Sequence, residues 1–200
     1  MTATVRDMSA ENRETELVDD EIVRNLARAA LFAALLGAFA YVSFPNPVSP
    51  APVTLQVLGV FLAGVFLGPV WGAAACGLYL LAGALGAPVF SSGAAGLGVL
   101  LGPTAGYLLA YPFAALVIGA VVHGGRTLAD PDEVGLGRLV GALLVGTVVI
   151  YASGVLGLMV VQNLDPVEAF LAGAAAFVPA ELLKIAAAVA IVRSDAIVAT

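Results

Sequence analysis

No charged side chain occurs between Ala29 and Gly125, a stretch that makes up about half of the 200-residue chain. Its apolar runs are long enough for several helices, each of which needs roughly 20 residues to cross a bilayer. In the whole chain 61% of the residues are hydrophobic and 11% are charged, which excludes an ordinary soluble domain. The runs are apolar on all sides, whereas the strands of a membrane barrel alternate. We therefore expect an all-α integral membrane protein.

Helix-breaking residues divide the apolar sequence into spans. Four prolines between positions 45 and 52 end the first span, and Gly68-Pro69 separates the second from the third. Pro179 suits the first turn of a last helix. The expected spans cover about residues 26–44, 53–67, 70–85, 103–122, 139–161 and 178 onward. The sequence thus predicts a bundle of six transmembrane helices.

An irregular outer loop is expected between the third and fourth helices. The Ser-Ser-Gly run at 91–93 and the glycines at 96, 98 and 102 disfavour a straight helix. Irregular backbone at membrane depth is tolerated only where it is buried in protein or lines a cavity. We expect this loop to fold back over the bundle.

The charges predict how the chain lies in the membrane. Residues 1–25 are polar and acidic and lack the basic region and cleavage site of a signal peptide, so they are expected to form a cytoplasmic leader. Residues 26–198 form the expected transmembrane domain. With the N-terminus inside, the arginines at 6, 13, 24, 28, 126, 138 and 193 all fall on or near the cytoplasmic side. We therefore predict a multi-pass protein of the cell membrane with both termini in the cytoplasm.

Glu181 and Lys184 are the leading candidates for a binding site. They lie three residues apart in an otherwise apolar helix, where ionisable groups are costly unless they pair or meet a polar ligand. Either a structural pair between helices or ligand contact would explain them.

Other polar residues offer hydrogen bonds near the expected outer side. Thr54 and Gln56 open the second span, and the amide of Gln56 can donate and accept at once, although a cap or an interhelical bond is an equal alternative. Ser91, Ser92 and Gly93 either contribute hydroxyl and backbone groups to a site or form a plain surface turn.

Several other residues have a structural alternative. Tyr107, Tyr111 and Tyr151 either pack against a ligand ring or lie in an interfacial belt, which we favour for Tyr111. Cys76 is expected to be a packing residue, and His123 a helix cap or a solvent-facing residue. The stripes Ala29 with Ala33 and Ala30 with Ala34 would let another helix approach closely, which makes them candidates for docking a partner.

Some functions are not expected. The only histidine is predicted at the opposite side of the membrane from Ser91 and Ser92, so no nucleophile and base come together. We therefore expect no enzyme and no catalytic residue. We also expect no metal site and no cofactor. The chain has no ATP-binding loop, so energy for transport would come from other chains or a gradient. It has no basic patch for nucleic acid.

The order of the motifs resembles the BioY family of biotin-transporter substrate-binding proteins. The similarity runs from about residue 29 to 193 and is carried by PVTLQVLGV at 52–60, LAGVFLGP at 62–69, PVF at 88–90 and GLGVLLGPT at 96–104. Near the C-terminus the family pattern Pro-Gly-Asp-x-x-Lys resembles PAELLK at 179–184, with Ala180 and Glu181 replacing Gly and Asp.

The resemblance implies a function. Members of this family are six-helix S components of energy-coupling factor transporters, which capture biotin from outside and work with a transmembrane coupling protein and paired ATPases. Glu181, Lys184, Gln56, Thr54 and the loop residues Ser91, Ser92 and Gly93 would then bind polar groups of biotin. Leu55, Phe90, Leu97 and Tyr107 would form the apolar wall. The alternatives are an S component for another small vitamin, which the Glu181 replacement allows, and a biotin transporter without the coupling module.

Overall fold

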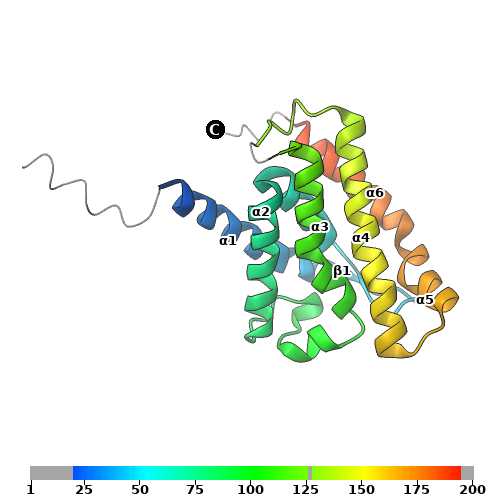
Figure 1. Ribbon diagram of the computed structural model, residues 1–200. Helices are drawn as coiled ribbons and strands as arrows, with labels where there is room; N and C mark the ends of the chain where they lie inside the picture. The colour runs from blue at the N-terminus through cyan, green and yellow to red at the C-terminus, as the bar shows by residue number, and fades with distance from the viewer. Residues whose placement is uncertain (1–19, 126–127, 195–200) are drawn as a thin grey trace, which may run out of the picture.

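The computed structural model describes residues 20–125 and 128–194, which are mainly helical (Figure 1). Its helices are α1 (Asp20–Tyr41), α2 (Gln56–Ala84), α3 (Ala105–His123), α4 (Leu136–Gln162), α5 (Pro166–Gly173) and α6 (Val178–Val192). Five segments in this part of the chain are long and apolar enough to cross a membrane: α1, α2, α3, α4 and the stretch Pro166–Val192 that contains α5 and α6. The expectation of an all-α membrane protein therefore agrees with the structure at this level.

Helix α2 folds back on itself at Gly68, which has φ +75° and ψ −174°, a backbone region open essentially only to glycine. Gln56 Nε2 donates to the hydroxyl of Tyr79, 23 positions later, whereas a straight helix would hold these residues ~35 Å apart. Gly72 lies beside Ala63, so closely that a Cβ on Gly72 would be 2.8 Å from the Ala63 carbonyl oxygen. Residues 56–67 and 69–84 are thus the two antiparallel arms of a hairpin.

The first arm of the hairpin is the centre of the molecule, and almost every residue in it is buried. Two glycines let its neighbours approach. A Cβ on Gly59 would meet the side chain of Leu36 in α1 at 2.9 Å, and one on Gly64 would meet Ile118 in α3 at 2.9 Å. Small residues of this kind allow close helix packing within a bilayer, where the hydrophobic effect between helices is weak.

The first helix starts earlier than the sequence suggested. It begins at Asp20, so the end of the expected leader 1–25 is helical, and residues 1–19 of that leader lie outside the described part of the chain. Its N-terminal end projects away from the other helices, with Ile22, Val23 and Leu26 exposed (Figure 1).

Two short strands that the sequence did not predict connect α1 to the hairpin. The strands β1 (Ser43–Phe44) and β2 (Val53–Thr54) pair antiparallel on either side of the proline loop. The segment between α2 and α3 contains the 3-10 turns η2 (Ser91–Gly93) and η3 (Leu97–Leu101). Ser43 Oγ and Ser91 Oγ are 3.1 Å apart, and the Tyr41 hydroxyl donates to the Pro88 carbonyl at 2.6 Å, so this segment is tied to β1 and the end of α1.

The C-terminal part contains a short helix before α6. Asp165 caps α5 by accepting from the amides of Val167 and Glu168 at 2.9 and 3.0 Å. After the 3-10 turn η4 (Ala175–Phe177), α6 begins at Val178 with Pro179 in its first turn, which confirms the predicted start of this helix.

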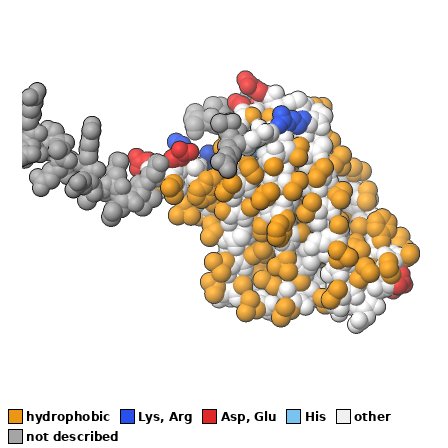
Figure 2. Space-filling model, viewed as in Figure 1, with side chains coloured by type: hydrophobic (Ala, Val, Ile, Leu, Met, Phe, Trp, Pro, Cys, Tyr) orange, Lys and Arg blue, Asp and Glu red, His pale blue; other side chains and the backbone are white. Residues whose placement is uncertain are grey.

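The surface is apolar over most of the bundle. Figure 2 shows hydrophobic side chains covering most of the visible face, with charged groups gathered mainly at the upper end. On α4 the exposed side chains include Val148, Leu156 and Val160. Such a surface suits contact with lipid, because a soluble protein rarely exposes apolar patches of this extent.

Two single residues have clear structural roles. Cys76 is fully buried and unpaired, which confirms that it is a packing residue. His123 is buried, so of the two roles expected for it, helix cap or solvent-facing residue, the second was wrong. Its Nδ1 accepts from the Ala129 amide at 3.0 Å, and Nε2 therefore carries the hydrogen that bonds the Val65 carbonyl at 3.0 Å. It fastens the segment after α3 to the hairpin.

Candidate functional site

A cavity of about 270 Å³ lies where the end of the proline loop with β2, the hairpin, the segment after it, α3, α4 and α6 meet. This volume is just below the roughly 300–1,000 Å³ of most small-molecule sites. Of the sequence candidates, the cavity is lined by Thr54, Gln56, Phe90, Ser91, Ser92, Tyr107 and Lys184; its other lining residues include Val57, Val99, Thr104, Leu108, Tyr111, Tyr151 and Phe177. The fold thus brings together candidates that are widely separated in the sequence.

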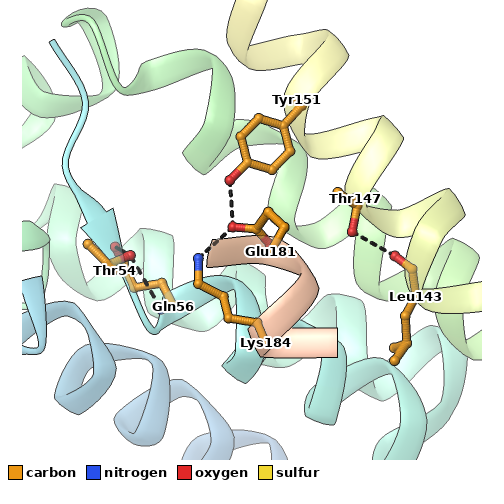
Figure 3. A network of polar contacts seen from close by, with 7 residues as sticks. All are labelled: Thr54, Gln56, Leu143, Thr147, Tyr151, Glu181 and Lys184. Atoms are coloured by element: carbon orange, nitrogen blue, oxygen red, sulfur yellow. Dashed lines mark hydrogen bonds and ion pairs between the residues drawn. The ribbon is translucent and has the colours of Figure 1, made fainter. Parts of the chain in front are cut away.

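The charge pair is buried beside this cavity. Glu181 and Lys184 are 4% and 5% exposed, and Glu181 Oε1 accepts from Lys184 Nζ at 2.5 Å and from the Tyr151 hydroxyl at 2.6 Å. Figure 3 shows the ammonium of Lys184 and the hydroxyl of Tyr151, which comes from α4, converging on the same carboxylate. Lys184 and Tyr151 line the cavity, whereas Glu181 lies behind them and lines a separate surface pocket between α4 and α6.

The second carboxylate oxygen of Glu181 differs from the first. Glu181 Oε2 is buried and accepts no hydrogen bond from the described residues. An unpaired buried acceptor is costly, by ~1–3 kcal/mol or more for a charged group. A ligand with an N–H or O–H donor that reached this oxygen would remove that cost.

Thr54 and Gln56 form the second buried polar group at the cavity. The Thr54 hydroxyl donates to Gln56 Oε1 at 3.0 Å, and the Gln56 backbone amide donates to Thr54 Oγ1 at 3.3 Å (Figure 3). With Nε2 held by Tyr79, the Gln56 amide has a fixed orientation. It still has one N–H and one oxygen lone pair for a ligand.

Aromatic rings form much of the remaining wall. Tyr107 and Tyr151 lie edge to face with centroids 5.8 Å apart, and Phe177 packs against both. The Tyr107 hydroxyl donates to the Gly173 carbonyl at 2.7 Å, which holds the ring in place. Tyr111 is buried and lines the cavity, so the interpretation of Tyr111 as an interfacial belt residue was wrong.

Besides Glu181, three other sequence candidates do not line the cavity. Leu97 is 65% exposed, because the turn η3 directs it away from the bundle, and Gly93 lies beside the ring of Tyr41. Leu55 precedes the hairpin and is absent from the lining. The expectation that Leu55 and Leu97 form part of the apolar wall is therefore corrected. Phe90 and Tyr107 do line the cavity.

Tyr79, Thr104 and Phe177 belong to the site or support it and were not singled out by sequence reasoning. Aromatic residues in apolar helices give no sign of the face on which they lie. For Phe177 a signal was available, since it stands two residues before Pro179 in the motif that contains the charge pair.

The two alanine stripes on α1 face in different directions. Ala29 is fully buried against Leu67 and Ala75, and Ala33 is half-buried against the core, whereas Ala30 and Ala34 are exposed. Ala29 and Ala33 therefore pack within this chain, which corrects their expected docking role. Only the stripe of Ala30 and Ala34 is free to contact another protein.

The comparisons with known proteins agree with this architecture. Residues 7–198 match the model of the BioY family. Two relatives named "Biotin transporter BioY", from Rhodobacter capsulatus and Rhizobium etli, are each 38% identical to the chain; the matches cover 81% and 80% of this chain and 87% of each relative. A relative of the same name from Thermotoga maritima is 37% identical over 54% of this chain and 62% of its own. A crystal structure described as the S-component for biotin from an ECF-type ABC transporter superposes with a TM-score of 0.78 at 26% identity, covering 88% of this chain and 93% of that one.

Proposed function

Because the chain belongs to the BioY family, we propose that it is the membrane substrate-binding component that captures biotin from outside for uptake by an energy-coupling factor transporter of the ABC type. The names of its relatives and the similarity to the crystallised S-component for biotin support both the ligand and the transport role. The family is one of transporter components and gives no indication of catalysis.

The observation that carries this proposal is the buried polar network at the cavity wall. Biotin has a ureido ring with two N–H donors and one carbonyl acceptor, a thioether ring, and a valerate tail. Lys184 lines the cavity and can donate to the ureido carbonyl. Glu181 Oε2, which has no partner among the described residues, would accept from a ureido N–H if the ring reached past Lys184 and Tyr151. The aromatic rings of Tyr107 and Phe177 provide an apolar wall for the rest of the bicyclic system.

The replacement of Asp by Glu in the C-terminal motif is compatible with this role. The longer side chain of Glu181 still reaches both Tyr151 and Lys184, and Ala180 fits the helical backbone of α6. The pair is thus preserved as a buried, bonded unit.

We infer six membrane crossings, with the arms of α2 counted separately. The cavity and the segment after the hairpin would face outside, and the termini and the segment between α3 and α4 the cytoplasm. The sequence supports this orientation, because the segments 42–55, 85–104 and 163–177 contain no Lys or Arg. A ligand would then enter past Ser91 and Ser92.

Energy and release would come from the partner chains, a transmembrane coupling protein and ATPase subunits. The exposed stripe of Ala30 and Ala34 on α1 is the surface that we propose for docking, since small side chains allow a partner helix to approach closely.

Retention of labelled biotin by membranes tests the proposed function. Membranes from cells that express the chain should retain biotin above membranes from cells that do not, and excess unlabelled biotin should compete while riboflavin and thiamine should not. Retention of riboflavin or thiamine instead, by protein shown to be folded, would assign another vitamin and contradict the proposal.

A further inference from the structure

In the described part of the chain, the cavity has no free cationic group that could pair with the carboxylate of a bound biotin. Among the described residues that line it, Lys184 is the only one with a cationic side chain. Its ammonium is already 2.5 Å from Glu181 Oε1, so the buried end of the cavity is electrically balanced before any ligand binds.

This balance determines which end of a biotin molecule can be buried. If the carboxylate of the ligand lay next to Lys184, two carboxylates would share one ammonium at a site where Glu181 and Lys184 are only 4% and 5% exposed. An uncompensated charge in such a place is strongly unfavourable. The ureido ring is neutral, and its carbonyl oxygen can accept from Lys184, which lines the cavity, so burying the ring there adds no charge. The ring should therefore lie at the charge pair, with the tail directed toward the rim.

The rim offers neutral groups to that tail. Among the lining residues, Ser92 and Ala94 are exposed, and Ser91 and Thr104 are half-buried. The sequence has no Lys or Arg from Ala29 to Gly125, and the segment between α4 and α5 adds only the acidic Asp165. Hydroxyl groups donate to the oxygen of an amide as well as to a carboxylate.

From this arrangement we propose that the site does not require the free carboxylate of its ligand. The protein therefore also binds biotin amides, including those in which the tail is joined to the side-chain amine of a lysine. This inference rests on the proposed function, since it assumes that biotin is the ligand. It extends the substrate class from the free vitamin to its carboxyl-amidated forms.

Competitive calorimetry on the purified full chain tests the inference with biotin, its primary amide and its lysine conjugate. Both amides should bind within about fivefold of biotin, because an exposed charge contact contributes little. Affinities more than about 100-fold weaker for both amides, with biotin binding intact, would overturn the inference but leave the proposed function standing. Failure of biotin itself to bind would overturn both.

A cation added at the rim provides a second, independent test. Ala94→Lys places an ammonium beside the tail, so biotin should bind about threefold to fivefold more tightly in low salt while its primary amide is unaffected. Ala95→Lys is the matched control, since Ala95 is exposed but does not line the cavity. An equal gain for the amide, or no gain for biotin in well-folded Ala94→Lys, would contradict a carboxylate at the rim.

Discussion

At the residue scale, the site depends on one carboxylate whose two oxygens differ. Glu181 Oε1 accepts from Lys184 and Tyr151, while Oε2 has no partner among the described residues. The protein thus holds the carboxylate in a fixed orientation, and we propose that the second oxygen accepts from the ligand. A ligand donor bonded to Oε2 would remove the cost of leaving this buried acceptor unpaired, so this hydrogen bond should contribute strongly to affinity.

Removing one member of the pair should destabilise the protein more than removing both. Lys184→Met leaves Glu181 charged and buried, which should lower the free energy of unfolding by ~3–5 kcal/mol. The double variant Glu181→Gln/Lys184→Met leaves no charge and should lie closer to the wild type. Unfolding of the purified variants in detergent measures both; equal losses for the single and double variants would contradict the burial of the pair.

The hydroxyl of Tyr151 should matter for ligand affinity, since it orients Glu181. Tyr151→Phe keeps the ring and removes a hydrogen bond to a charged group, worth ~1.5–3 kcal/mol, so biotin should bind at least about tenfold more weakly. Thr147→Val is the control, because the Thr147 hydroxyl on the same helix bonds the Leu143 carbonyl and the residue does not line the cavity. A similar loss of biotin affinity in both variants would argue against an orienting role.

The sequence predicted charged site residues better than uncharged ones. Glu181 and Lys184 stand out because charge in an apolar helix requires an explanation. Tyr111 carries no such signal, because a tyrosine near a helix end suits the membrane interface as well as the protein interior. Only the packing of α3 against the hairpin determines that Tyr111 is buried. Ala29 and Ala30 are equally small, and the sequence does not say which one faces the bundle.

At the element scale, the hairpin of α2 depends on a single glycine. A Cβ at Gly68 would be strained by the positive φ and would run into the side chain of Leu128. Gly68→Ala should therefore lower the free energy of unfolding by ~1–3 kcal/mol. Gly77→Ala in the second arm, where a Cβ meets nothing within 4 Å, should be neutral or stabilising. Thermal unfolding of the two variants measures the difference, and equal midpoints would contradict a strained turn.

The contact between α3 and α4 shapes the cavity wall. A Cβ at Gly154 in α4 would overlap the ring of Tyr107, which lines the cavity. Gly154→Ala should displace this ring and weaken biotin binding at least about tenfold, as calorimetry can measure. Gly141→Ala in the same helix has open space at its Cβ and should bind normally. Normal binding by folded Gly154→Ala would mean that this ring does not set the shape of the site.

Helix breaks were predictable, whereas short elements were not. Gly68-Pro69 and Pro179 identify a turn and a helix start because their backbone limits are local. The strands β1 and β2 have two residues each, and their pairing joins Ser43 with Thr54 across the proline loop. Such pairing depends on contacts between distant positions, which no local pattern encodes.

At the scale of the whole molecule, the proposed orientation puts the proline loop outside and the segment between α3 and α4 inside. Because Cys76 is buried, the parent chain should be inert to a membrane-impermeant thiol reagent. In intact cells Ser49→Cys should be labelled, and Glu133→Cys only after permeabilisation. The reverse pattern would invert the orientation and place the cavity on the cytoplasmic side.

The central claim is that the cavity beside Glu181 and Lys184 binds biotin. Calorimetric titration of purified wild type, Glu181→Gln and Leu183→Ala with biotin tests it most directly. Leu183 is 73% exposed on the same helix, so Leu183→Ala should bind like the wild type, while Glu181→Gln should bind at least about 100-fold more weakly. Binding by folded Glu181→Gln as tight as that of the wild type would contradict the account and make the pair purely structural.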